Sequence, residues 1–259
     1  MSGLHSSRNL PFMGILEYRT ATIACVKSNS YHNAVEKYHM PSLSITYSME
    51  CTSQLEDTGE FASVYKGEVF SFDHNSDEEV KVGCVQFTLI NVYHAIDEWG
   101  DIHEALDLEA RLYNYSCLFS DHNEFSDCIA DAGMDLEELQ VLIVDHICLK
   151  EEFRGLGVTQ QIISDAERRF AHNRGLTVLM CVPLQFTNFT DDPYIAEQVS
   201  SFNENFETSQ YKLECFYRTI GFRPIVPDPE DSNSAHFMAR PSSVDYYKVL
   251  SDDTENKNL

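Results

Sequence analysis

A glycine-containing turn between a buried strand and a helix is the feature of this chain best suited to chemistry. Residues 139–149 are a nearly continuous apolar run rich in β-branched side chains, which predicts a strand buried on both faces. The turn that follows reads Arg154, Gly155, Leu156, Gly157, Val158 and Thr159. Glycines here let free backbone N–H groups and a helix dipole close around a phosphate, and Arg154 adds a cation. The chain has neither a GxxxxGK[ST] P-loop nor a GxGxxG motif, so tight packing remains an alternative role for the glycines.

Two side chains capable of acid–base chemistry interrupt the apolar run. In a regular strand Asp145 aligns with Ile143 and Ile147. Burying its carboxylate is costly unless partners satisfy it, so Asp145 is either a functional group or a hydrogen-bonded structural one. The imidazole of His146 is a suitable base, but it points to the opposite face unless a bulge exchanges the two positions.

The first half of the chain predicts a strand meander followed by helices. Strict alternation over residues 42–49 indicates a half-buried strand, and similar patterns predict strands over 61–72 and 80–93. Residues 30–38 carry a weak helical signal. Residues 103–119 place apolar side chains at helical spacing, and 121–138 contain a second short helical pattern, so 94–138 is expected to be a lid or an inserted helical layer.

The second half predicts a β-α-β unit. Val158, Ile162, Ala166 and Phe170 recur every four residues and should face the core. The polar positions of the same helix are expected to face outward: Gln160, Gln161, Asp165, Glu167, Arg168 and Arg169. A buried strand over 177–182, a polar surface stretch after Pro183, a helix over 208–219 and two short strands, FRPIV and AHFMAR, complete the pattern.

In this context the chain resembles the GNAT acetyltransferase superfamily, and more broadly poorly characterised bacterial GNAT-like proteins. Arg154 and Gly157 match the family's pyrophosphate loop, (Q/R)-x-x-G-x-(G/A), with Thr159 at its last position. The second family signature, an aromatic pair before a Gly-Phe strand start, corresponds to residues 216–222 (FYRTIGF). The resemblance covers roughly residues 139–227. It implies an α+β, GNAT-like fold: a mixed, mostly antiparallel central sheet flanked by helices, with a helical insertion between strands 3 and 4.

The resemblance also implies one GNAT-like domain over residues 1–259. Residues 1–93 would form its N-terminal helix and strand meander, 94–138 the acidic helical insertion, 139–240 the acetyl-CoA-binding half, and 241–259 a loose tail.

The activity that the resemblance implies is acetyl-CoA-dependent N-acetylation by direct attack of an amine on the thioester. Tyr217 is then the candidate general acid, with packing beside Phe216 as its alternative role, and Asp145 is the candidate base. Gln210 stands where many relatives have an Asn that touches the cofactor. The residues expected to bind the cofactor are Ile147, Leu149, Arg154, Gly155, Leu156, Gly157, Val158, Thr159 and Gln210.

The charge of the chain is strongly negative and unevenly placed. Its formal net charge is −24, and residues 50–138 hold 22 acidic and 3 basic side chains, against 11 and 8 in residues 139–225. This balance disfavours nucleic acid or an anionic membrane as a partner, because both require basic patches. It favours a cationic acceptor, such as a small amine, a polyamine or a peptide, although a solvated acidic surface explains the charge as well.

Cysteine and apolar patterning place the chain in a reducing compartment. Eight cysteines occur without a C-x-x-C pair, no apolar run approaches 18 residues, and the N-terminus lacks a signal-peptide pattern. We therefore expect a cytoplasmic protein with reduced thiols. The histidines lack metal-ligand spacing, so no metal is expected, and a homodimer is left open.

Two other functions compete with the enzyme. Thr159 and Gln210 depart from the family pattern, which motivates a catalytically degenerate GNAT-fold protein that binds CoA or has a regulatory role. A toxin that acetylates aminoacyl-tRNA is disfavoured because the central acidic segment would repel tRNA.

Overall fold

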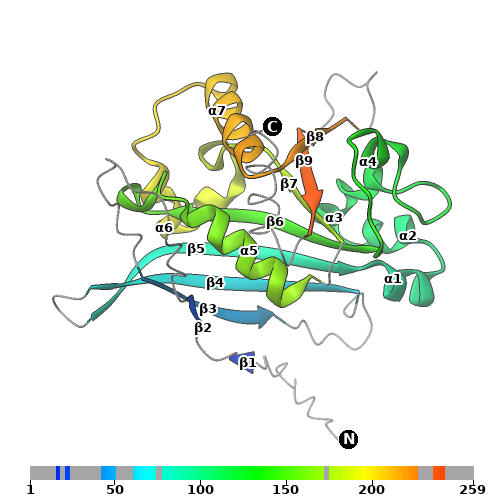
Figure 1. The fold of residues 1–259 in the computed structure, drawn as a ribbon, viewed down its shortest axis with the longest axis horizontal. Coiled ribbons are helices and arrows are strands. Elements are labelled where there is room, and N and C mark those ends of the chain that lie inside the picture. The colour runs from blue at the N-terminus through cyan, green and yellow to red at the C-terminus, as the bar shows by residue number, and fades with distance from the viewer. Residues whose placement is uncertain are drawn as a thin grey trace, which may run out of the picture.

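A mixed, mostly antiparallel sheet runs through the protein, with helices on both of its faces (Figure 1). The computed structural model describes residues 16–17, 21–23, 42–50, 61–73, 78–171, 175–226 and 236–242. Within them, nine strands pair in the order β1-β3-β4-β5-β6-β7-β9-β8, and β2 also pairs with β3. The strands are β1 Leu16–Glu17, β2 Ala21–Ile23, β3 Leu43–Glu50, β4 Ala62–Asp73, β5 Glu78–Asn91, β6 Gln140–Leu149, β7 Leu176–Met180, β8 Arg223–Ile225 and β9 Phe237–Pro241. This is the predicted α+β class, compatible with a GNAT-like fold.

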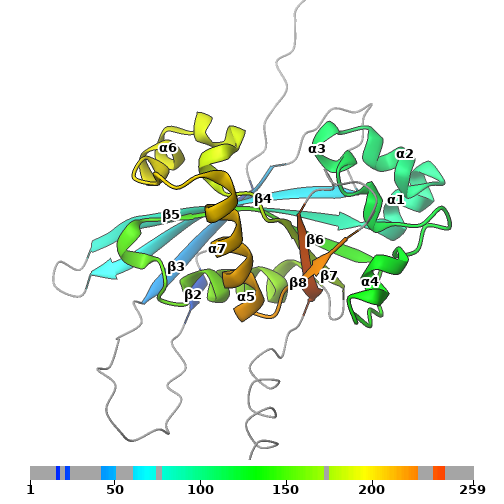
Figure 2. The ribbon, with the colours of Figure 1, turned by 90° about the horizontal axis from the view of Figure 1, so that it is seen from above.

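The helices divide between the two faces of the sheet, as Figure 2 shows for α5 on one side and α6 and α1–α3 on the other. The α-helices are α1 Val92–Trp99, α2 Ile102–Asp107, α3 Ala110–Tyr113, α4 Asp127–Asp131, α5 Val158–Phe170, α6 Pro193–Val199 and α7 Phe206–Thr219. Short 3-10 turns lie at η1 Ser116–Leu118, η2 Glu151–Phe153, η3 Leu184–Phe186 and η4 Asn188–Asp191. Helix α5 packs in one apolar core with Leu142, whereas α1–α4 pack in a second core with Val141 and Ile143. Because successive strand residues face opposite sides, β6 is buried on both faces, as predicted.

The strand meander is confirmed. β3, β4 and β5 pair antiparallel and lie within two residues of the predicted ranges, and Leu43, Ile45 and Tyr47 of β3 are buried in the core. The weak helical signal over 30–38 lies outside the described residues. β8 and β9 also form as predicted, but β9 extends to Pro241, the first residue of the expected tail; residues 243–259 lie outside the described part.

The insertion between β5 and β6 is helical, as predicted, but the single helix expected over 103–119 is wrong. It is divided into α2, α3 and η1, because Glu109 adopts an extended backbone (φ −128°, ψ 112°). The strand that was expected to reach residue 93 ends at Asn91. Asn91 caps the N-terminus of α1, because its side chain accepts a hydrogen bond from His94 N. The stretch after Pro183 is not only surface, since α6 buries Ile195 and Val199.

Helix α5 departs from its predicted orientation. Asp165 and Glu167 were expected to face solvent, but only 2% and 1% of their surfaces are exposed. Asp165 accepts hydrogen bonds from Tyr47 Oη at 3.2 Å and Arg169 Nε at 2.8 Å, and it also pairs with Arg168. Tyr47 of β3 and two arginines of α5 itself thus make the burial of the Asp165 carboxylate tolerable.

Glu167 pairs with an equally buried arginine of β9. Arg240 Nε and Nη2 donate to the two carboxylate oxygens of Glu167 at 2.9 and 2.7 Å, and Arg240 Nη1 donates to Ile220 O at 2.6 Å. The pair therefore joins α5 to β9 and to the end of α7.

We predict that Arg240→Met lowers the free energy of unfolding by about 3–5 kcal/mol, because it leaves the Glu167 charge buried without its partner. The double variant Glu167→Leu/Arg240→Met should recover most of that loss, since it removes both charges. Urea denaturation followed by circular dichroism measures both values. Arg218→Met, at an exposed position of α7, is the control and should change stability by about 0.5 kcal/mol or less. An equal loss in Arg240→Met and in the control would contradict the prediction.

Candidate functional site

β6 and β7 separate soon after they meet, and a cavity opens between them. Their parallel pairing joins residues 141–143 to residues 176–178. Beyond this point β6 continues to Leu149 without a described partner on the β7 side, and the cavity here has a volume of about 700 Å³. Its walls come from residues 144–149 of β6, the end of β7, the turn before α5, and helices α6 and α7. Of the predicted site residues, those that line it are Asp145, Ile147, Leu149, Arg154, Gly155, Thr159 and Tyr217.

The glycine turn has the backbone geometry of an anion-binding site at a helix N-terminus. Gly155 and Gly157 have φ values of 72° and 76°, a backbone region that favours glycine. Gly157 caps α5 without any side-chain hydrogen bond, and the first helical bond runs from Gln161 N to Gly157 O. The N–H groups of the first turn therefore remain available at the positive end of a 13-residue helix. Leu156 and Val158 pack into the core instead of lining the cavity.

Arg154 has partners of its own at the mouth of the cavity. Its Nε donates to Leu149 O at 2.9 Å and its Nη2 to Gln198 O at 2.7 Å. The guanidinium also lies over the Phe202 ring, 4.5 Å from the centroid. Arg154 thus links the end of β6 to α6 and to an aromatic side chain, in addition to lending its charge to the cavity.

Tyr217 reaches the cavity from α7. Its ring makes edge contacts with Phe216 and Phe222, at centroid distances of 5.3 and 5.4 Å. Burial raises the pKa of the phenol, and Cys181 adds to the rise, so Tyr217 keeps its proton at neutral pH. A buried, protonated phenol can donate a proton to a leaving group.

Gln210 lies apart from the cavity. Its side chain is buried, and Nε2 donates to Cys181 O at 3.3 Å, next to the end of β7. It is not among the residues that line the cavity.

Asp145 is an extra residue in β6. Gln86 of β5 pairs with His146 and Phe87 pairs with Val144, so Asp145 has no partner in the register. This is a β-bulge, which changes the face of the residues that follow it. Asp145 and His146 consequently lie on the same face of the sheet, where a regular strand would have placed them on opposite faces, while Ile147 packs toward the α5 side.

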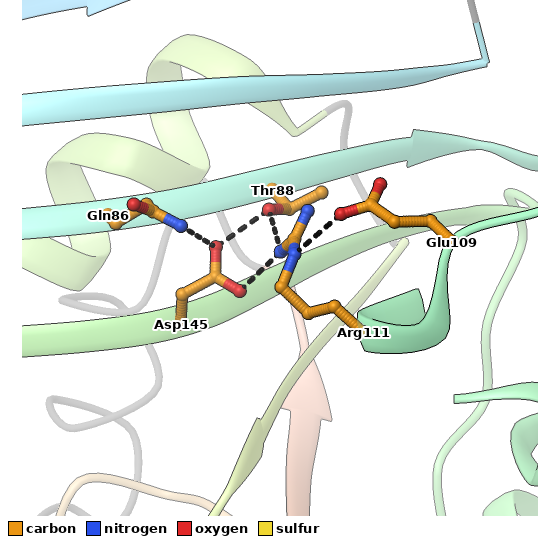
Figure 3. Close-up of polar contacts among 5 residues, drawn as sticks. All are labelled: Gln86, Thr88, Glu109, Arg111 and Asp145. Carbon is orange, nitrogen blue, oxygen red and sulfur yellow. Dashed lines mark hydrogen bonds and ion pairs between the residues drawn. The ribbon is translucent and has the colours of Figure 1, made fainter. Parts of the chain in front are cut away.

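The carboxylate of Asp145 is fully engaged (Figure 3). Arg111 Nη1 donates to Oδ1 at 2.7 Å, Thr88 Oγ1 donates to Oδ2 at 2.7 Å, and Gln86 Nε2 donates to Oδ2 at 3.4 Å. Burial raises the pKa of Asp145, and Arg111, Thr88 and Gln86 oppose that rise. Both oxygens accept hydrogen bonds, which is the environment of a structural carboxylate.

Arg111 is the residue of this cluster that the sequence interpretation missed. It comes from α3, and its Nε also donates to Glu109 at 2.9 Å. The sequence did contain a signal, because Arg111 is the only Lys or Arg in the acidic stretch 94–138. A single cation retained among so many acids indicates a specific partner.

We predict that Arg111→Met lowers the free energy of unfolding by about 1–3 kcal/mol. The range is below that of a fully buried pair because the Arg111 side chain is 30% exposed, whereas that of Asp145 is 3% exposed. In a cycle with Asp145→Asn, the coupling energy should exceed about 1 kcal/mol. Glu109→Gln, which removes only the surface partner of Arg111, is the control and should cost about 0.5 kcal/mol or less. Additive effects of the two substitutions would contradict a coupled pair.

Comparisons with known proteins found no match: no family model, no curated protein and no solved structure matches the chain. Within the described ranges, no helix is both long and apolar enough to cross a bilayer. No group of three His, Cys, Asp or Glu side chains that could hold a metal occurs in the same residues. The function is therefore inferred from the fold class and from the geometry of the cavity.

Proposed function

We propose that this protein is an acetyl-CoA-dependent N-acetyltransferase that transfers the acetyl group directly to an amine. One observation carries the proposal: the protonated phenol of Tyr217 and the open N-terminal turn of α5 belong to the same cavity, between the diverging strands β6 and β7. An anion-binding helix end and a proton donor in one cavity suit a phosphorylated thioester.

The cavity offers a place for each part of acetyl-CoA. The free N–H groups at the start of α5, with the hydroxyl of Thr159, would hold the pyrophosphate. Ile147 and Leu149 line the cavity along β6 and would contact the pantetheine arm. Arg154 would contribute its positive charge at the mouth, although two of its N–H groups already bind backbone carbonyls.

Acetyl-CoA would supply an activated thioester. The amine nitrogen forms a bond to the carbonyl carbon, the C–S bond breaks, and the thiolate leaves. Tyr217 would give its proton to that thiolate and regain one from solvent. The proton lost by the amine needs a base. Both oxygens of Asp145 already accept hydrogen bonds, so Asp145 suits a structural role better than the role of base. His146, which also lines the cavity, is then the candidate base.

The acceptor is an amine, and its cationic character is supported only by the charge of the whole chain. Charged side chains around the cavity are balanced, with Asp145 and Glu204 against Arg154 and Lys212. The acidic insertion packs through α1–α4 on the part of β6 that precedes the bulge.

A second candidate function is CoA binding without chemistry. It is favoured by the hydrogen bonds that already occupy both carboxylate oxygens of Asp145, the predicted base. Calorimetry with acetyl-CoA, together with thiol release from a panel of amines, separates the two: tight binding without turnover on any amine supports this alternative.

Tyr217→Phe should lower turnover about 100-fold and leave the Kd for acetyl-CoA within about twofold, because it removes only the proton donor. Thiol release measures turnover, and calorimetry measures binding. Tyr211→Phe is the matched control, since Tyr211 lies on the same helix with 68% of its surface exposed. A parallel loss of binding and turnover would assign Tyr217 to packing instead.

Arg154→Ala should raise the Kd for acetyl-CoA about 10-fold or more, while turnover at saturation falls less. The reason is that the Arg154 charge would bind acetyl-CoA and the transition state equally, so its loss weakens binding and leaves the chemical step unchanged. Calorimetry and saturation kinetics measure the two effects. Unchanged acetyl-CoA affinity would restrict Arg154 to its links with Leu149 and Gln198.

A further inference from the structure

A second cavity lies beside β6 on the face that carries His146. Its volume is about 460 Å³, and it is lined by β3, β4, β5, β6 and the segment from η4 to α6. The charged and aromatic side chains around it are Lys66, Glu68, Lys81, His146, Phe189 and Asp192. Residues of the segment 188–195 form one of its walls, so this cavity depends on a stretch that the sequence predicted to be surface.

The two cavities meet at His146, which is the one residue that lines both of them among the described residues. The bulge at Asp145 brings His146 to this position, opposite Gln86 of β5. The ring of His146 also packs against that of Phe189, with centroids 4.5 Å apart. A molecule in the second cavity would therefore approach the first cavity past the imidazole.

The charges around the second cavity cancel, in contrast to the net charge of the chain. Two lysines, Lys66 and Lys81, and two acids, Glu68 and Asp192, line it. Lys81 Nζ lies 2.5 Å from Glu68 Oε1 and 4.9 Å from the centroid of the Tyr194 ring. A polycation gains no excess negative charge here, whereas a molecule with one positive and one negative end finds a partner for each.

One unsatisfied polar atom belongs to a residue that lines this cavity, His146, and another belongs to Tyr194, whose ring contacts the lining residue Lys81. His146 Nδ1 and Tyr194 Oη are buried without a hydrogen-bond partner in the described residues, and Trp99 Nε1 is the third such atom found there. Buried polar groups are normally satisfied, so the unsatisfied Nδ1 of His146, a residue that lines the cavity, is consistent with a polar occupant.

We propose that the second cavity binds the acyl acceptor and that this acceptor is a zwitterionic amine, such as an amino acid, instead of a polycation. The inference rests on the proposed acetyltransferase function. The carboxylate would face Lys66 and Lys81, and the amino group would face His146 and the first cavity. After the ammonium group gives one proton to His146, the amine nitrogen bonds to the acetyl carbon as the C–S bond breaks. Tyr217 protonates the thiolate, and the nitrogen loses its second proton to solvent.

The test in the unmodified protein compares L-phenylalanine with L-phenylalaninamide and spermidine as acceptors, with acetyl-CoA and thiol detection. The first two share a side chain that can contact Phe189 and differ in the carboxylate. The amide has the less basic and more readily deprotonated amine, so chemistry alone favours the amide. We expect kcat/KM to be about 10-fold higher for the acid. A higher kcat/KM for the amide or for spermidine overturns the proposal.

Substitutions of the two lysines test whether they bind the carboxylate of the acceptor. Lys81→Met should bring the acid and the amide to within about threefold of each other, because it removes a cation that would face the carboxylate. Lys150→Met is the matched control, since Lys150 lines neither cavity, and should leave the ratio unchanged. An unchanged ratio in both Lys81→Met and Lys66→Met would place the carboxylate elsewhere and overturn the assignment.

Binding is tested apart from turnover with a tryptophan reporter. The chain has one Trp, Trp99 in α1, so Trp99→Phe/Phe189→Trp places the only indole at the second cavity. Saturable fluorescence change with L-phenylalanine supports the proposal, and if thiol release is then absent only the proposed acetyltransferase function fails. Thiol release from the unmodified protein without a fluorescence change in the variant keeps the enzyme and overturns the second cavity as its acceptor site. Loss of both signals contradicts both proposals.

Discussion

The bulge at Asp145 is the constraint on which the centre of this protein depends. One extra residue in β6 changes the face of every later residue in that strand, so His146 and Asp145 share a side and Ile147 faces the first cavity. The bulge lies just beyond the point where β6 stops pairing with β7. Arg111 holds the carboxylate of the bulged residue from a helix outside the sheet. The placement of these side chains therefore follows from one local irregularity, which one ion pair holds.

The net negative charge of the chain and the few charges that line each cavity act over different distances. Most acidic side chains of 94–138 are exposed on or between α1 and α4, whereas charges around each cavity occur in opposite pairs. Exposed charges are screened beyond about 8 Å at physiological ionic strength. Net charge can thus govern solubility and the approach of charged molecules, but selection inside a cavity depends on its own few side chains.

Regular patterns predicted the regular parts of the fold. Period-two alternation found β3–β5, and a buried apolar run followed by a glycine turn found β6 and the start of α5, because burial imposes those patterns directly. The bulge was not predictable in this way, since one added residue leaves the composition of a strand unchanged. Glu167 was wrongly expected to face solvent because its partner, Arg240, lies 73 residues away in the sequence. A helical pattern read alone does not reveal a partner contributed by another element.

The ion pair between Arg111 and Asp145 connects two segments that are 34 residues apart. Either residue alone would leave a desolvated charge, so a change at one position lowers fitness unless the other changes with it. Homologous chains should therefore contain both charges or neither, and a chain that has lost the α3 segment should carry a neutral residue at the bulge. The helical insertion and the centre of the sheet are in this sense a single evolutionary unit, although they are separate elements of the fold.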